Sequence, residues 1–150
     1  MADRFRYYLR VRYSECDAQK VVFNARYADY VDVATVEFLR ASCPDFTSIE
    51  YHLVKQTIEW KAPARFDQIL ELTVYLQHIG TTSFSFATEI RVAGQEQIIT
   101  RVETANVLLD PATMKKTSIP AELRTALERG AAGVVTDHAG YCSLSTSVPI

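Results

Sequence analysis

A carboxylate stands just ahead of an amphipathic stretch near the start of this 150-residue chain. Residues 15–30 read ECDAQKVVFNARYADY, with Asp17 in a polar turn and Asn24 where the amphipathic part begins. A carboxylate can activate water or attack an acyl carbon, and the free amides at a helix N-terminus can hold a developing oxyanion. We therefore expect Asp17 and the backbone amide of Asn24 to face the same small molecule.

Both residues also have a purely structural interpretation. Asp is favoured in turns because its side chain accepts hydrogen bonds from nearby backbone amides. Asn is a preferred N-cap of helices, and capping is compatible with an oxyanion role for its amide. Glu15 lies two residues before Asp17, and we expect it to be a solvated turn acid rather than half of a carboxylate pair.

Two patterns flank this turn and must position it. Residues 4–13 alternate, which predicts a half-buried strand. Apolar residues then recur every three or four positions from Tyr27 to Leu39, the spacing of one buried helical face. We expect this helix to be about 18 residues long and to end near Ser42, because Pro44 disfavours helical geometry before it. The apolar face of the strand comprises Phe5, Tyr7, Leu9, Val11 and Tyr13.

The middle of the chain is rich in strand-forming residues. Val, Ile, Thr, Tyr and Phe with period-two segments predict four further strands, over residues 53–61, 70–79, 82–92 and 97–109. Pro120 suits the first position of a short helix that ends at Gly130. A five-stranded antiparallel sheet curled around the long helix would bury both, so the predicted class is α+β. Dimerisation commonly covers the edges of such a sheet.

Composition indicates an ordinary globular domain. The net charge of −2 gives no general attraction to nucleic acid or to an anionic membrane. No stretch reaches the roughly 20 apolar residues of a membrane-spanning helix, and the amino terminus lacks the apolar run of a signal peptide. Three well-separated cysteines argue against a disulfide framework and suit a cytoplasmic location. We expect residues 1–130 to form the domain and residues 131–150 a tail of undefined structure.

Other chemistries find little support in the sequence. Cys16 as a nucleophile needs a neighbouring His, and His52, His78 and His138 form no recognisable Cys–His arrangement. The same histidines are too scattered for the spacing of a metal site, so no metal is expected. The chain has no glycine-rich phosphate loop and no dinucleotide fingerprint, and no cofactor is expected.

Several segments between about residues 5 and 127 match a known pattern. They are VRYSECD, DAQKVVFNARYADY, IEWKAPARFDQILEL, TTSFSFATEI and NVLLDPATMKKTSIPAEL. On these segments the chain resembles hot-dog-fold acyl-CoA thioesterases of the 4-hydroxybenzoyl-CoA thioesterase-like (YbgC/FadM) group. The resemblance implies a long central helix wrapped by an antiparallel sheet. It also implies hydrolysis of acyl-CoA by a homodimer or homotetramer with active sites at the subunit interface.

The resemblance assigns roles to positions of this sequence. The catalytic carboxylate falls on Asp17, the oxyanion-binding helix start on Asn24, and an aromatic position one turn into the helix on Tyr27. The guanidinium of Arg65 could reach a CoA phosphate or pair with Asp67. The residues expected to contact substrate are Val22, Phe23, Glu59, Lys61, Arg65, Thr82 and Ser83.

Two positions depart from the family pattern. Lys20 stands where the turn usually has Gly, and Asn24 replaces a His found in many members. Two other functions stay open beside an acyl-CoA thioesterase. One is a hot-dog thioesterase that acts on acyl carrier protein, and the other is a catalytically silent hot-dog protein that binds acyl groups.

Overall fold

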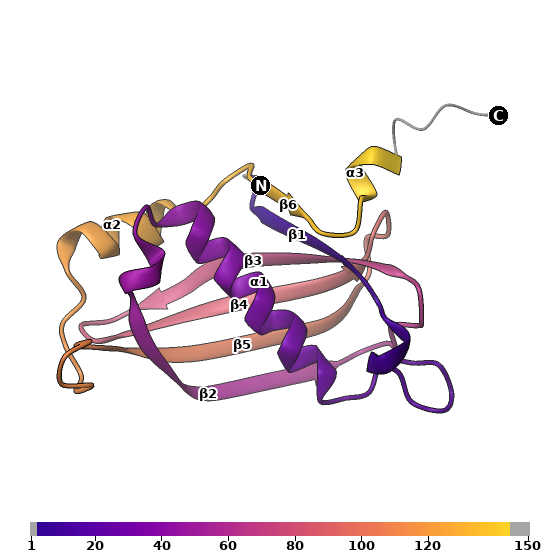
Figure 1. The fold of residues 1–150 in the computed structure, drawn as a ribbon, viewed down its shortest axis with the longest axis horizontal. Coiled ribbons are helices and arrows are strands. Elements are labelled where there is room, and N and C mark those ends of the chain that lie inside the picture. The colour runs from indigo at the N-terminus through magenta and orange to yellow at the C-terminus, as the bar shows by residue number, and fades with distance from the viewer. Residues whose placement is uncertain (1–2, 145–150) are drawn as a thin grey trace.

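Residues 3–144 are described by the computed structural model, which shows a six-stranded sheet with a long helix across one face (Figure 1). The strand order is β2-β5-β4-β3-β1-β6. The strands are β1 (Phe5–Arg10), β2 (Glu50–Trp60), β3 (Ile69–Ile79), β4 (Ser83–Val92), β5 (Ile98–Leu109) and β6 (Val135–Asp137). The helices are α1 (Arg26–Ser42), α2 (Ala121–Arg129) and α3 (Tyr141–Leu144), with 3-10 turns η1 (Tyr13–Glu15) and η2 (Phe46–Ser48).

The predicted α+β hot-dog architecture is confirmed, with one strand more than expected. The five predicted strands form antiparallel pairs with their neighbours. The sixth, β6, lies parallel to β1 and makes the sheet mixed, with Val135 opposite Arg6. Three residues are too few to show period-two alternation, so the pattern of the sequence could not predict this strand.

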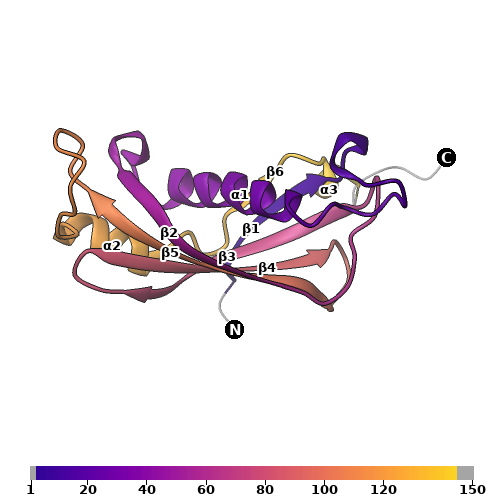
Figure 2. The same cartoon turned by 90° about the horizontal axis from the view of Figure 1, so that it is seen from below.

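The helix α1 lies along one face of the twisted sheet (Figure 2). Its predicted apolar stripe is buried throughout, and Phe38 packs edge-to-face against Phe5 and Phe86 at centroid distances of 5.8 and 5.2 Å. Fully burying such a side chain contributes about 1.5–3 kcal/mol relative to leaving it exposed. The buried residues of the stripe are Tyr27, Tyr30, Val31, Ala34, Phe38 and Leu39.

The first strand is shorter than predicted, and two of its side chains lie in other surroundings. The chain leaves β1 after Arg10, so Tyr13, expected on the buried face, is 70% exposed. Tyr8, expected among the solvated arginines, is buried because Tyr141 of α3 stacks on it at 4.8 Å. Among residues 3–144, no helix is both long and apolar enough to cross a membrane.

The packing of α1 predicts a large effect of one truncation. We expect Phe38→Ala to lower the free energy of unfolding by about 3–5 kcal/mol, through lost burial and the cavity left behind. Urea unfolding followed by circular dichroism measures it. The control is Val36→Ala on the exposed side of the same helix, for which we expect a change within about 0.5 kcal/mol. Equal effects of the two variants would contradict the packing described.

Candidate active site

Asp17 opens a tight turn and holds it together. Its amide donates to the carbonyl of Val21 (2.9 Å), and its Oδ1 accepts from the amides of Gln19 (2.8 Å) and Val21 (3.4 Å). The structural interpretation of Asp17 as a turn residue is therefore correct. Its second carboxylate oxygen, Oδ2, has no hydrogen bond within the described residues, and the side chain is exposed. One oxygen shapes the turn while the other stays open to a ligand or water.

Lys20 adopts a backbone conformation that residues with a Cβ rarely adopt. Its φ is +64°, in the left-handed region that glycine occupies without steric cost. The carbonyl of Lys20 accepts from the amide of Phe66 (2.9 Å), and Val21 pairs with Arg65. These contacts join the turn to the segment between β2 and β3.

The helix α1 begins at Arg26, one residue later than a cap at Asn24 would place its start. Ala25 occupies the N-cap position of α1 without a side-chain hydrogen bond, so the prediction that Asn24 caps the helix was wrong. The amide of Arg26 bonds to the carbonyl of Phe23 (2.9 Å). Within residues 3–144, the amides of Asn24 and Ala25 have no acceptor. Unsatisfied donors ahead of a helix are the kind of group that an oxyanion site requires.

Tyr27 connects the helix to the same neighbouring segment. It is 2% exposed, and its hydroxyl accepts a hydrogen bond from the amide of Ala64 (3.1 Å). Burial raises the pKa of Tyr27, which keeps the hydroxyl neutral. Ala64 also accepts from the amide of Val22 (2.9 Å) through its carbonyl. Tyr27 therefore positions the start of α1, and Val22 is buried beside it, whereas Phe23 is 54% exposed.

The other predicted contact residues divide between the two ends of the sheet. We call the end that holds Trp60 the Asp17 end, because the segment after Trp60 pairs with the Asp17 turn. Glu59, Lys61 and Arg65 lie there and are exposed. Their roles in binding stay predictions.

Thr82 and Ser83 lie at the opposite end, which we call the hairpin end. Ser83 starts β4 and pairs with Val107 of β5, whereas Trp60 pairs with Thr100 of the same strand. The path along β5 between these two positions is about 23 Å at the usual rise per residue. A single chain therefore does not bring the hairpin to Asp17.

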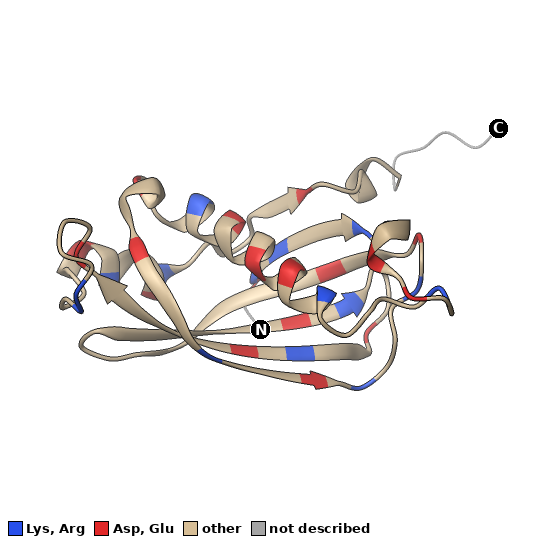
Figure 3. Ribbon diagram, turned by 60° about the horizontal axis from the view of Figure 1, so that its bottom comes forward, with Lys and Arg blue, Asp and Glu red and all other residues tan. Residues whose placement is uncertain are grey.

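Unpaired basic side chains gather at the Asp17 end. Asp67 pairs with Arg10 (3.3 Å) and not with Arg65, so the structural alternative considered for Arg65 was wrong. In the described part of the chain, Arg65, Lys61 and Lys20 belong to no ion pair. Figure 3 shows acidic and basic positions mixed over the molecule, with acidic positions along α1.

Two neighbours of Asp17 differ in how well they were predicted. Glu15 is buried (7% exposed) and accepts from Arg12 and Tyr30, so the expectation of a solvated acid was wrong. The overlooked signal is its spacing of three from Arg12, at which the carboxylate and the guanidinium form an ion pair. Burial and the charges of Glu15 and Asp17 raise the pKa of the Cys16 thiol, which disfavours the thiolate that a nucleophile needs.

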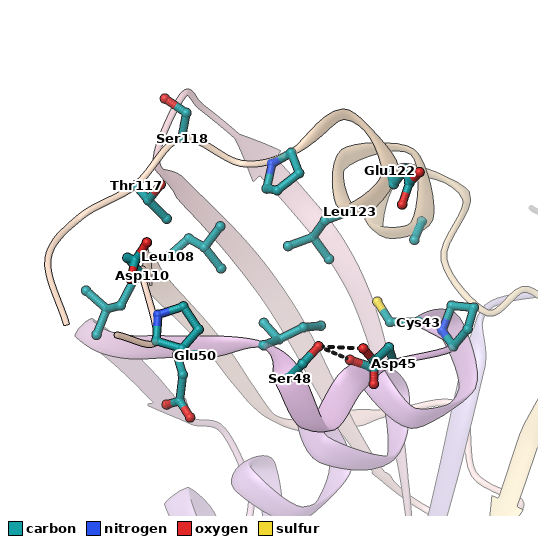
Figure 4. Close-up of a pocket in the computed structure, with 16 residues that line it drawn as sticks. Cys43, Asp45, Ser48, Glu50, Leu108, Asp110, Thr117, Ser118, Glu122 and Leu123 are labelled. Carbon is teal, nitrogen blue, oxygen red and sulfur yellow. Dashed lines mark hydrogen bonds between the residues drawn. The ribbon is translucent and has the colours of Figure 1, made fainter. Parts of the chain in front are cut away.

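One cavity lies at the hairpin end, far from Asp17. It encloses about 430 Å³ between η2, the start of β2, the end of β5 and α2 (Figure 4). Leucines and prolines line it together with the carboxylates of Asp45, Glu50, Asp110 and Glu122. Asp17 and Asn24 do not line this cavity. Both residues are exposed in a single chain.

Comparisons with known proteins agree with this fold. A profile of the Thioesterase-like superfamily matches residues 11–127. The chain is 30% identical over 124 residues to the acyl-CoA thioester hydrolase YbgC of Escherichia coli, covering 79% of this chain and 92% of that protein. It is 28% identical to the 1,4-dihydroxy-2-naphthoyl-CoA hydrolase of Nostoc punctiforme, covering 83% and 86% of the two chains.

A solved structure shares the same architecture. The probable thioesterase YbaW from Escherichia coli superposes with a TM-score of 0.74 at 26% identity, covering 83% of this chain and 96% of that one. The profile match spans most of the chain, and the relatives are similar over most of their length. The chain therefore belongs to the thioesterase-like superfamily and is a thioesterase with the hot-dog fold.

Proposed function

We propose that this thioesterase hydrolyses acyl-CoA to the free acid and CoA, with Asp17 as base or nucleophile. One observation carries the proposal: an open carboxylate oxygen lies in the turn that leads directly to the unbonded amides of Asn24 and Ala25. The name of the YbgC relative, an acyl-CoA thioester hydrolase, supports the substrate class.

The reaction uses these groups in a defined order. A water activated by Asp17, or the carboxylate itself, adds to the thioester carbon, and the carbonyl oxygen gains negative charge. The amides of Asn24 and Ala25 would donate to that oxygen, and one such donor contributes about 2.7–4 kcal/mol in the transition state. The carbon–sulfur bond then breaks, and the CoA thiolate leaves and takes up a proton. When Asp17 is the nucleophile, water hydrolyses the resulting anhydride.

The basic residues at the Asp17 end would bind the phosphates of CoA. Lys20, Lys61 and Arg65 are exposed and free of ion pairs among the described residues, so they offer charge to an anionic ligand at little cost. The net charge of the whole chain is −2, so this attraction is local rather than general. Arg65 follows Ala64, which bonds to both Tyr27 and Val22 and is therefore held against the start of α1.

A homodimer formed through β2 would complete the site. The strand is an edge of the sheet, and Leu53, Val54 and Trp60 on it are 46%, 61% and 51% exposed. Unpaired edge strands with apolar side chains favour pairing with another strand. An antiparallel pair about a two-fold axis near the middle of β2 would place the hairpin end of one subunit beside the Asp17 end of its partner. Thr82 and Ser83 would then contribute to the partner's site, because they lie too far from Asp17 of their own chain.

The first prediction concerns Asp17. We expect Asp17→Asn to lower kcat by at least about 100-fold, because the amide cannot act as base or nucleophile, while its oxygen still accepts the turn's hydrogen bonds. Thiol release from short, long and aromatic acyl-CoAs measures the effect. Asp110→Asn is the matched control, because Asp110 holds a similar turn through the amides of Ala112 and Thr113. Wild-type turnover by Asp17→Asn on every substrate would end the assignment, and binding without turnover by the native protein would favour a silent acyl-binding module.

The second prediction concerns the nucleotide portion of CoA. We expect Arg65→Ala to raise KM for acyl-CoA about tenfold, since a hydrogen bond to a charged group contributes about 1.5–3 kcal/mol, with little change in kcat. The same acyl group on N-acetylcysteamine lacks the phosphates and is the control substrate. Equal effects on both thioesters would show that Arg65 does not contact the phosphates.

The third prediction concerns assembly. A residue near the two-fold axis meets its own copy, so Val54→Lys should repel the partner and release monomers, with hydrolysis falling in parallel. Light scattering after gel filtration measures the mass. Val33→Lys, at a 44% exposed position on α1, is the control and should leave the assembly unchanged. A native protein that is monomeric and fully active would contradict the composite site.

A further inference from the structure

The turn that carries Asp17 is secured by a buried carboxylate that the hydrolysis itself does not use. We propose that Glu15 is a positioning residue, which locks the Asp17 turn onto α1 and thereby sets the distance from Asp17 to the amides of Asn24 and Ala25. The proposal rests on the proposed function of Asp17. It assigns Glu15 no contact with substrate.

The side chain of Glu15 joins two segments that are distant in the chain. Its Oε1 accepts from the amide of Arg12 (2.7 Å) and from the hydroxyl of Tyr30 (2.9 Å). Its Oε2 accepts from Nε of Arg12 (2.9 Å), and Nη2 of the same guanidinium lies 2.8 Å from Oε2. Because Tyr30 belongs to the buried stripe of α1, these bonds tie η1 directly to the helix.

The backbone of Glu15 holds the far side of the turn. Its carbonyl accepts from the amide of Phe23 (3.0 Å), and the adjacent Cys16 pairs with Val22. The chain therefore leaves Glu15, passes through Asp17 and returns to Glu15 just before Asn24. Side-chain and backbone bonds of this one residue fix the base of the turn and join it to the helix.

Glu15 is ionised where it lies. Burial acts to raise its pKa, but hydrogen bonds from the Arg12 amide, the Arg12 guanidinium and the Tyr30 hydroxyl outweigh burial and bring the pKa below its ordinary value. Burial and the nearby Glu15 charge raise the pKa of Tyr30, so its hydroxyl remains a donor. The bonds are charge-assisted, which makes them stronger than neutral ones.

Packing alone does not hold the turn on this side. A cavity of about 390 Å³ borders Glu15 and Tyr30, with Arg12, Val33 and His138 also among its lining residues. On this side the side chain of Glu15 borders open space. The hydrogen bonds of Glu15 supply the restraint that packing does not.

The test combines two substitutions that break the same contact. Glu15→Gln keeps the shape but removes the charge, and its amide group places donors against the guanidinium of Arg12. Tyr30→Phe removes a single hydroxyl and leaves the ring to pack against Tyr27. Glu128→Gln on the exposed face of α2 is the control for Glu15→Gln. The readouts are kcat and KM for acyl-CoA hydrolysis, and amide hydrogen exchange over the whole chain.

We expect the variants to lose turnover because the Asp17 turn is displaced, with little change in substrate binding. Glu15→Gln should lower kcat by about 10–100-fold, the size of effect that a displacement near 1 Å produces, with KM within about threefold. Tyr30→Phe should act in the same direction, and the double variant should be no worse than Glu15→Gln, because the pair acts as one unit. Exchange should accelerate at least about tenfold over residues 16–22 and remain unchanged in β3 and β4, as local opening requires.

Several results would overturn the proposal. Unchanged exchange over residues 16–22 in both variants would show that Glu15 does not hold the turn. Additive losses, or exchange accelerated equally throughout the chain, would indicate a general contribution to stability instead. If Glu15→Gln does not fold, kcat and the amide exchange of Tyr30→Phe decide. If the native protein hydrolyses no acyl-CoA, the proposed function fails, while exchange still decides whether Glu15 holds the turn.

Discussion

The burial of one face of α1 against the sheet determines where the groups at the start of the helix lie. Phe38 fixes the middle of the helix between Phe5 and Phe86, and the helical repeat then determines the direction of every other side chain. Tyr27 lies on the same buried face and reaches the amide of Ala64, so the rotation of the helix also fixes its contact with the segment after β2. The amides of Asn24 and Ala25 take their position from this packing.

The carboxylate of Asp17 has a structural role in its turn, and the same contacts restrain it for the chemical role proposed above. One oxygen of the carboxylate accepts two backbone amides, which restrains the side chain in a single orientation. A group that is already restrained loses little conformational freedom when it binds or reacts, which is the advantage of a preorganised site. Lys20 contributes by accepting a left-handed backbone conformation that costs a residue with a Cβ about 1–2 kcal/mol.

Periodicity predicted the parts of the molecule that depend on local order. The buried stripe of α1 and the five longer strands follow from spacings of 3.6 and 2 residues, and the turn character of Asp17 follows from its residue type. The burial of Glu15 did not follow, because it depends on Tyr30, a partner on another element. The burial of Tyr8 depends in the same way on Tyr141, far along the chain.

The candidate site shows the same division between local pattern and long-range contact. Asp17 and Asn24 are neighbours in sequence, and the structure keeps them in one turn-and-helix unit. Thr82 and Ser83 came from a family pattern that carries no distance, and the strand register places them at the hairpin end. Only the order and direction of the strands reveal that separation, and neither can be read from residue spacing.

The short strand β6 limits how such a sheet can grow. It occupies the outer side of β1, while β2 at the other edge carries exposed apolar residues over an eleven-residue strand. A sheet with two long open edges could add copies at both sides and build an endless ribbon, as head-to-tail contacts do. Here the edge beyond β1 is the three-residue strand β6. The carboxylate of Asp137, its last residue, accepts a hydrogen bond from the amide of Tyr141 at the start of α3. Among residues 3–144, β2 is therefore the longer of the two edge strands, and the proposed pairing of two copies uses this edge.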